Sequence, residues 1–214
     1  MLPQLYVLGD SISMQYGPDL ERFTRGYFRY SRKGSELQGT EDLDQPLKVN
    51  GGDSQMVLDF MIDKDQEVFW KQDMIVLLNC GLHDIKIDRS TMQRQIELSA
   101  YKDNVLRACE LLQNRGCQVV WVRTTPVDEE QHNRKYPKQF LRYTRDVLAF
   151  NRAADEVMAQ LGIPAIDLYT FTCSLGEDIF SDHVHYKADI RALQAAFIAG
   201  HLLGIELRES TTVD

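Results

Sequence analysis

The chain has 214 residues, of which 43% are hydrophobic and 26% are charged, and this length and composition predict one globular domain over residues 1–214. Lysine and arginine number 24 against 32 aspartates and glutamates, which gives a net charge of −8. Nucleic acid is therefore not expected as a partner, because a polyanion is repelled by an acidic protein.

The N-terminal residues and the cysteines bear on the compartment of the protein. No run of apolar residues reaches the roughly 18 that a membrane span needs, so no membrane-spanning segment is expected. The first residues lack the basic and apolar regions of a signal peptide, which favours a cytoplasmic protein, with secretion as the alternative if a leader has been removed. The four cysteines contain no C-x-x-C pair and are expected to be reduced: Cys80, Cys109, Cys117 and Cys173.

Short apolar runs alternate with longer segments of helical period, the pattern of βαβ units around a parallel sheet. The runs predict five strands, at residues 5–8, 47–50, 74–78, 118–122 and 163–166. Three of them are almost entirely apolar, as is typical of strands covered on both faces. The polar segments 29–45 and 124–138 are expected to be long connections of the kind that carries binding function.

Apolar residues recur every three or four positions in three later segments, which predicts three helices. The first covers residues 98–112 and is stopped by Gly116, and the second covers residues 140–161 and is stopped by Gly162. The last begins near Lys187 and ends at Gly204.

The first expected strand ends in Gly9, Asp10 and Ser11. Ligands bind at the carboxyl ends of strands in open parallel sheets, so Ser11 is expected at the mouth of a site. A second Gly-Asp-Ser stands at residues 52–54, so the tripeptide alone is not specific. For either copy, an ordinary turn with a helix N-cap is the alternative interpretation.

Asp182 and His185 stand three positions apart just before the last helix. One turn of chain can then direct the carboxylate at Nδ1 of the imidazole while Nε2 faces outward. A serine hydroxyl is a weak nucleophile until such a base removes its proton. We therefore predict Ser11 as nucleophile, His185 as base and Asp182 as the carboxylate that orients the base.

Polar residues also follow the third expected strand, among them Asn79 and His83. They belong to the same edge of the sheet as Ser11, and their side chains can donate hydrogen bonds to an oxyanion.

These segments, taken in their order along the chain, resemble the sequence blocks of the SGNH (GDSL-type) hydrolases, which are esterases and lipases. The resemblance covers nearly the whole chain. The resemblance implies an α/β fold, namely a three-layer α/β/α flavodoxin-like architecture with a mostly parallel five-stranded sheet. Residues 9–11 resemble the nucleophile block and residues 182–185 the D-x-x-H block. Residues 50–54 resemble the second block, which implies that the amide of Gly52 helps to form an oxyanion hole and that Ser54 caps a helix over residues 55–61.

The third block departs from the family, which usually has G-x-N-D where this chain has Gly81, Leu82, His83 and Asp84. His83 stands in place of the asparagine, and a neutral imidazole N–H can replace an amide as an oxyanion donor. Asn79 is the alternative donor, or else a residue that caps the end of the strand.

His183 and Cys80 suggest two other kinds of site, a zinc site and a cysteine nucleophile. His183 and His185 have the H-x-H spacing of zinc sites, but the early D-x-H pair of metal-dependent phosphoesterases is missing. We expect no metal and no other cofactor, and we expect His183 to be a bystander. Cys80 is expected to be a small buried hydrophobic residue, because no nearby residue would lower the pKa of its thiol.

The resemblance implies a serine esterase that hydrolyses a carboxylic ester through an acyl-enzyme on Ser11. Its substrate is then a small-molecule or carbohydrate ester, and the lack of an apolar lid segment favours a short acyl group such as acetyl on a sugar. The first alternative is a ligand-binding descendant of the fold without activity, which only the altered third block favours. The second and less favoured alternative is a metal-dependent phosphoesterase, on the H-x-H spacing of His183 and His185.

Overall fold

The computed structural model describes residues 2–34, 49–135 and 140–210, and at its centre lies a five-stranded sheet. The strands are β1 (Gln4–Leu8), β2 (Arg29–Arg32), β3 (Met74–Leu78), β5 (Gln118–Val122) and β7 (Ala165–Ile166). Their order is β2-β1-β3-β5-β7, and every neighbouring pair is parallel. The expected five-stranded, mostly parallel sheet is therefore confirmed.

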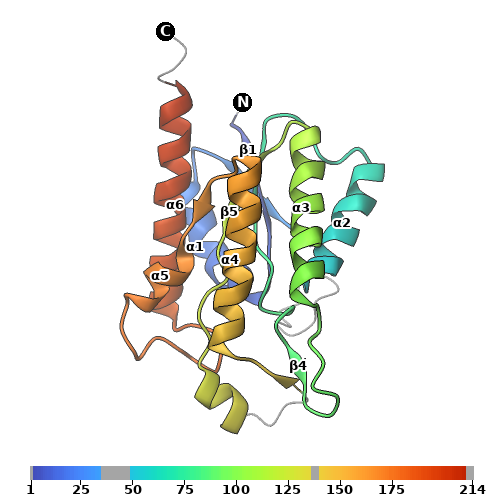
Figure 1. Ribbon diagram of the computed structural model, residues 1–214. Coiled ribbons are helices and arrows are strands. Elements are labelled where there is room, and N and C mark those ends of the chain that lie inside the picture. The colour runs from blue at the N-terminus through green and yellow to red at the C-terminus, as the bar shows by residue number, and fades with distance from the viewer. Residues whose placement is uncertain (1, 35–48, 136–139, 211–214) are drawn as a thin grey trace.

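Helices cover both faces of this sheet (Figure 1). On one face, α1 (Ser11–Thr24) packs against α6 (Ala188–Ser210), which also contacts the short α5 (Leu168–Cys173). On the other face, α3 (Leu98–Asn114) lies between α2 (Ser54–Gln66) and α4 (Thr144–Leu161). This arrangement is the expected three-layer α/β/α architecture.

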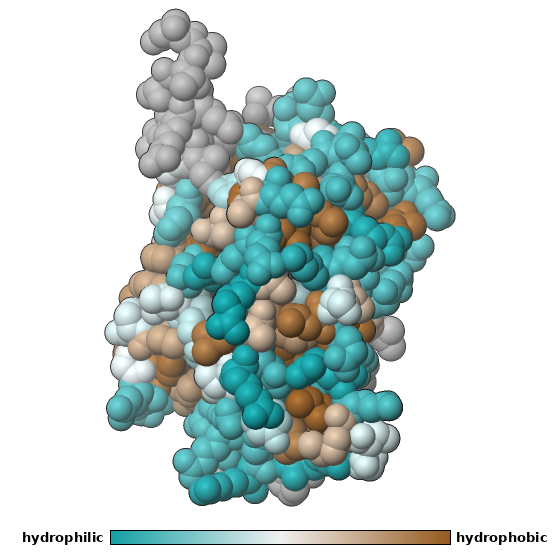
Figure 2. All heavy atoms as spheres, in the orientation of Figure 1, coloured by the Kyte–Doolittle hydropathy of each residue, from teal (hydrophilic) through white to brown (hydrophobic). Residues whose placement is uncertain are grey.

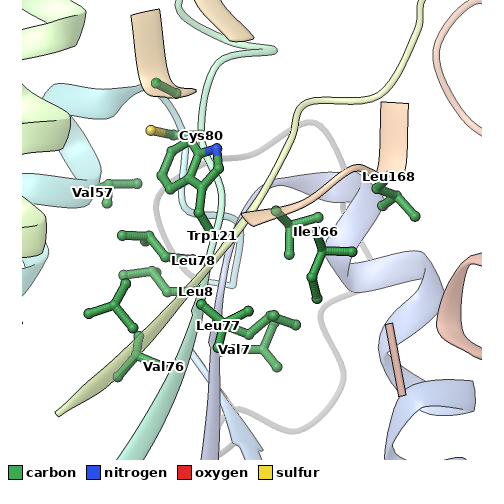
Figure 3. Close-up of a cluster of buried hydrophobic side chains, with 14 of the residues drawn as sticks. Val7, Leu8, Val57, Val76, Leu77, Leu78, Cys80, Trp121, Ile166 and Leu168 are labelled. Atoms are coloured by element: carbon green, nitrogen blue, oxygen red, sulfur yellow. The ribbon is translucent and has the colours of Figure 1, made fainter. Parts of the chain in front are cut away.

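The sheet is the centre of the hydrophobic core. All five residues of β3 are buried, which explains why its sequence is a continuous apolar run. Leu8 and Leu78 point toward the side of Val57 from α2, whereas Val7 and Leu77 point to the opposite face (Figure 3). Alternate residues of each strand thus fill the two interfaces between sheet and helices.

The second strand is not where the sequence pattern predicted it. Leu47 and Lys48 lie outside the described residues, and Val49 and Asn50 form a turn and a bend. The strand beside β1 is instead β2, inside a segment predicted to be a connection. β2 is an edge strand with half-buried and exposed side chains, so it tolerates arginines that a central strand would exclude.

Several helix boundaries also differ from the prediction. Phe140 belongs to β6 (Phe140–Leu141), which pairs antiparallel with β4 (Ile87–Asp88), and α4 begins only at Thr144. Helix α2 extends to Gln66 rather than ending at residue 61. At the C-terminal end of the fold, α6 continues beyond Gly204, because an isolated glycine lowers helix stability without ending a helix.

The residue that caps α2 is Asp53 and not Ser54. The side chain of Asp53 accepts a hydrogen bond from the backbone N–H of Met56, and Ser54 is the first helical residue. Ser54 is buried and engaged elsewhere: its N–H donates to Asp84 and its hydroxyl accepts from Asn104. Aspartate and serine are comparable N-cap residues, but the charge of the Asp53 carboxylate also complements the positive end of the helix dipole.

The hydrophilic surface of the protein agrees with its 26% content of charged residues. The face in Figure 2 is mostly hydrophilic, and apolar side chains gather on it in several separate patches. None of the described helices combines the length and the apolar character needed to cross a membrane. All four cysteines are free thiols, as predicted.

Candidate active site

Ser11 lies at the carboxyl end of β1, where the chain turns directly into α1. Asp10 is the N-cap of this helix: its carboxylate accepts from the N–H of Ile12 at 2.9 Å, and its carbonyl accepts from the hydroxyl of Ser13 at 2.7 Å. Ser11 is therefore held in the first helical turn, where backbone N–H groups have no acceptor within the helix. Its N–H is available to a substrate oxygen near the positive end of the helix dipole.

His185 and Asp182 come from the loop before α6, and the fold brings both to Ser11. Nε2 of His185 lies 2.9 Å from Oγ of Ser11, and Nδ1 lies 2.7 Å from Oδ2 of Asp182. The other carboxylate oxygen of Asp182 accepts from the N–H groups of Val184 and His185, each at 2.8 Å. This turn fixes the carboxylate against the imidazole, as the spacing of the two residues predicted.

The charge state of Asp182 decides the tautomer of His185. Burial by itself raises the pKa of this carboxyl, but the hydrogen bonds from the His185 ring and from two backbone N–H groups hold it well below its usual range. An ionised carboxylate can only accept, so Nδ1 of His185 carries its proton. Nε2 of the neutral ring is then left as an acceptor for the hydroxyl proton of Ser11.

Ser11 and His185 line a pocket of about 180 Å³ together with His83. Burial, followed by the positive charges of Lys86 and Arg142, holds the pKa of His83 well below its usual range, so its ring is neutral. Nδ1 of His83 lies 3.0 Å from the Lys86 ammonium, which can only donate. The ring proton of His83 is therefore on Nε2.

Nε2 of His83 lies 3.5 Å from the side-chain nitrogen of Asn50. The Oδ1 atom of Asn50 accepts from the N–H of Gly52 at 2.9 Å, which places its Nδ2 toward His83. Two donors cannot bond to each other, so the N–H of His83 is not consumed by Asn50. The geometry leaves the His83 N–H for an acceptor that enters the pocket.

The structure does not bring the other two expected oxyanion donors to this pocket. The N–H of Gly52 is directed at Asn50, as described above, and the amide nitrogen of Asn79 donates to the carbonyl of Val122 at 2.8 Å and to Oγ1 of Thr124 at 3.4 Å. Neither Gly52 nor Asn79 is among the described residues that line the pocket. Asn79 instead joins the ends of β3 and β5, the capping role that was the alternative for it.

His183, the first histidine of the H-x-H pair, has a different environment from His185. Nδ1 of His183 is 3.8 Å from Asp182, and the His183 ring packs against that of His132 with centroids 4.6 Å apart. Among the described residues, no three His, Cys, Asp or Glu side chains are grouped so that they could hold a metal ion. His183 lines the pocket without joining the line of hydrogen bonds from Asp182 to Ser11.

Asp84 and Cys80 are buried residues of the segment after β3, and their roles are structural. The Asp84 carboxylate accepts from the N–H of Ser54 at 2.8 Å and thus ties the third block to α2, and burial raises its pKa to about 7. Burial also raises the pKa of the Cys80 thiol well above its usual value, so this cysteine is a structural residue rather than a nucleophile.

Sequence reasoning missed three side chains near the site: Asn50, Lys86 and Arg142. Asn50 is the first residue of the second block and Lys86 follows the third block by two positions, so their place in the chain offered a signal. Arg142 is 60 positions from its hydrogen-bond acceptor, the carbonyl of Leu82, and no local pattern marks it.

Comparison of the sequence with protein-family models and with curated proteins gives no match. The structure, in contrast, is similar to that of a lipase/acylhydrolase from Enterococcus faecalis, with a TM-score of 0.68 and 15% identity over 95% of this chain and 96% of that one. A GDSL-like lipase from Bacteroides thetaiotaomicron matches with a TM-score of 0.67 and 13% identity, over 95% and 89% of the two chains. The chain has the fold of the SGNH (GDSL-type) hydrolases.

The structure is also similar to that of an acetyl xylan esterase, with a TM-score of 0.65 and 15% identity over 92% of this chain and 98% of that one. The resemblance inferred from short sequence blocks is thus confirmed at the level of the fold. At such low sequence identity, a shared fold does not identify the substrate or the reaction, which depend on the residues of the site.

Proposed function

We propose that the protein is a serine esterase that hydrolyses a carboxylic ester through an acyl-enzyme on Ser11. The observation that carries this proposal is the line of hydrogen bonds from Asp182 through His185 to the hydroxyl of Ser11, with distances of 2.7 and 2.9 Å. A protein that only binds a ligand has no need of a base aligned on a serine. Solved structures with this fold include lipases, acylhydrolases and an acetyl xylan esterase, which agrees with ester hydrolysis.

In the first half of the reaction, Oγ of Ser11 attacks the ester carbonyl carbon while Nε2 of His185 takes the hydroxyl proton. The tetrahedral intermediate places its negative oxygen between the backbone N–H of Ser11 and the Nε2–H of His83, which stabilise it. His185 then gives its proton to the alcohol, which leaves, and the acyl group stays on Ser11.

In the second half, water enters and His185 takes one of its protons as the water oxygen attacks the acyl-enzyme. The intermediate collapses, the acid leaves, and Ser11 recovers its proton from His185. One ester and one water thus give one acid and one alcohol, and the ionised Asp182 stabilises the imidazolium in both halves.

A short acyl group such as acetyl suits this site, because the pocket beside Ser11 has a volume of only about 180 Å³. The alcohol is then a small molecule or a carbohydrate. In a series of 4-nitrophenyl esters from acetyl to decanoyl, we expect kcat/KM to be highest for the shortest chains and to fall as the acyl chain outgrows the pocket.

The decisive test combines turnover of 4-nitrophenyl acetate with covalent labelling by a fluorophosphonate. We expect one label per chain, found on Ser11 by mass spectrometry and absent from the heat-unfolded protein and from the Ser11→Ala variant. A folded protein that neither hydrolyses esters of any length nor takes up the label would contradict the proposal. It would favour the ligand-binding alternative instead.

A further inference from the structure

A distant part of the chain holds the loop of residues 182–186, which carries two members of the proposed triad and is called the triad loop below. Two of its hydrogen bonds join it to the connection between β5 and α4. The hydroxyl of Tyr186 donates to the carbonyl of Pro126 at 2.7 Å, and the backbone N–H of Asp128 donates to the carbonyl of His183 at 3.0 Å. The position of the triad loop therefore depends on this connection.

Gln131 makes a third bond to the triad loop, and it acts on the residue that carries the carboxylate of the triad. Its side-chain Nε2 donates to the backbone carbonyl of Asp182 at 2.9 Å, across 51 positions of sequence. The same nitrogen lies 3.4 Å from Oδ2 of Asp128, and the backbone N–H of Gln131 donates to Oδ1 of Asp128 at 2.8 Å. Because an amide nitrogen carries two hydrogens, it can serve both acceptors. Gln131 is thus fixed by Asp128 and holds Asp182.

The backbone at Gln131 adds a second link to the triad loop. Gln131 begins η1 (Gln131–Lys135), a single turn of π-helix, and this rare conformation is found frequently at functional sites. The next residue, His132, donates its N–H to the carbonyl of Asp128 at 2.8 Å, and its buried ring packs against the ring of His183. The π-helical turn therefore lies directly against the triad loop.

The bond to the backbone of Asp182 matters because the side chain of Asp182 is not enclosed. This side chain is 33% exposed, whereas that of His185 is 9% exposed. Packing by itself therefore does not fix the carboxylate, and water can compete for it. A bonded carbonyl restricts the backbone from which the carboxylate reaches Nδ1 of His185. Misplacement of a catalytic group by about 1 Å can lower a rate by about 10²-fold.

We propose that Gln131 is a positioning residue of the triad, whose amide holds the backbone of Asp182 so that the carboxylate stays on Nδ1 of His185. This inference rests on the proposed esterase function and adds to it a residue that does not touch the substrate. Gln131 is not among the described residues that line the pocket beside Ser11. Loss of its amide is therefore expected to affect the chemical steps rather than substrate binding.

The first test removes the amide and keeps the approximate length of the side chain. Gln131→Met is expected to lower kcat on 4-nitrophenyl acetate by about 10- to 100-fold and to leave KM within about twofold. Gln131→Glu places an ionised carboxylate where the donor was, facing two oxygen atoms, so its loss of kcat should be at least as large. If the side chain only filled space, both variants would keep a near-normal kcat.

Gln113→Met is the matched control, because it removes the same kind of bond in another part of the fold. Nε2 of Gln113 donates to the carbonyl of Leu161 at 3.1 Å, close to the start of β5 and away from the carboxyl ends of the strands. We expect kcat of Gln113→Met to stay within about twofold of the wild-type value. Urea unfolding of each variant, measured in parallel, shows whether the assays contain folded protein.

Nitrogen NMR of protein with isotope-labelled histidine measures the contact between Asp182 and His185 without any substrate. At a pH where the ring is neutral, a carboxylate on Nδ1 keeps the proton there, so Nδ1 should resonate as a protonated nitrogen and Nε2 as an unprotonated one. In Gln131→Met, the two signals should move toward each other as the second tautomer becomes populated. Gln113→Met should keep the wild-type signals, and His185→Gln identifies them by their absence.

These two readouts separate failure of this inference from failure of the esterase proposal. A folded Gln131→Met protein with kcat within about twofold of the wild-type value would overturn the inference and leave the esterase proposal standing. A lower kcat with unchanged His185 signals would also overturn it, because Gln131 would then act elsewhere than on Asp182. If the wild-type protein hydrolyses no ester, the esterase proposal fails, and the His185 signals alone decide whether Gln131 holds Asp182.

Discussion

Nε2 of His185 lies 2.9 Å from the hydroxyl oxygen of Ser11, although 174 positions separate the two residues in the chain. Ser11 begins the first helix of the fold and His185 precedes the last one, and these two helices, α1 and α6, pack side by side on one face of the sheet (Figure 1). The packing of α1 against α6 therefore brings Ser11 and His185 together in the candidate site. It also means that kinetic tests of these residues need a parallel measurement of folding.

Replacing Ser11 by alanine removes the proposed nucleophile. We expect Ser11→Ala to lower kcat by about 10⁴- to 10⁶-fold at a nearly unchanged free energy of unfolding, because the other groups of the triad cannot act without it. Ser54→Ala is the matched control from the second Gly-Asp-Ser. It should change kcat by only a few-fold, although it removes the hydroxyl that accepts from Asn104 and so costs about 1 kcal/mol of stability. A Ser11→Ala enzyme with near-normal turnover would refute the serine mechanism.

His185 and His183 stand two positions apart and provide a matched pair for the base. We expect His185→Ala to lower kcat by at least about 10⁴-fold, since nothing else takes the serine proton. His183→Ala should retain most of the activity, because His183 is not bonded to Ser11 in the line from Asp182. Incubation with EDTA should not change the rate. Inactivation by the chelator, reversed by zinc or manganese, would point to a metal-dependent reaction instead.

His83 is expected to act on the charge that develops in the transition state. Its neutral ring should donate Nε2–H to the oxyanion, so we expect His83→Ala to lower kcat by about 10²- to 10³-fold with a smaller change in KM. His83→Asn should recover part of this loss by supplying an amide N–H. Steady-state kinetics of both variants on 4-nitrophenyl acetate measure the effect, and a loss of less than about threefold in His83→Ala would show that the Ser11 amide suffices.

Asn79 is the competing donor, and the structure predicts a different outcome for it. Because its amide bonds to the carbonyl of Val122, Asn79→Ala should lower the free energy of unfolding by about 1–3 kcal/mol, the cost of a buried carbonyl left without a partner. The kcat of the folded fraction should change only a few-fold. Denaturant unfolding and kinetics on the same samples test this, and a large loss of kcat at unchanged stability would assign the oxyanion to Asn79.

Asp84 should make the stability of the protein depend on pH near neutrality. Burial raises its pKa to about 7, whereas an aspartate in an unfolded chain titrates near about 3.9. Between these values the folded state holds a proton that the unfolded state has lost, so the stability contributed by this group is complete below about pH 4 and falls as the pH rises to about 7. Asp84→Asn cannot titrate and should escape this fall.

The difference in free energy of unfolding, Asp84→Asn minus wild type, should therefore increase by about 1–3 kcal/mol between pH 5 and pH 8. Urea unfolding at both pH values measures it. Asp63 has an exposed side chain, so Asp63→Asn serves as the control and should show almost no such change. A difference that stays constant or decreases with pH would mean that Asp84 is ionised throughout.

The sequence by itself determined the parts of the fold that depend on local patterns. The buried strands β1, β3 and β5 were predicted from continuous apolar runs, and α3 from its helical period. Asp182 and His185 were paired correctly because three positions of chain, folded into a turn, leave few other arrangements. Such features depend on residues that are close together in the chain, so a single sequence is enough to recognise them.

Only the tertiary structure decided the features that depend on distant partners. β2 carries two arginines in four residues and is a strand because β1 offers it an unpaired edge. Gly52 and Asn79 were expected at the oxyanion, but Asn50 and the end of β5 take up their N–H groups. Arg142 reaches the pocket only because β6 pairs with β4. A hydrogen-bond donor or a charge acts on whatever group lies within a few ångströms, and in these cases that group comes from elsewhere in the chain.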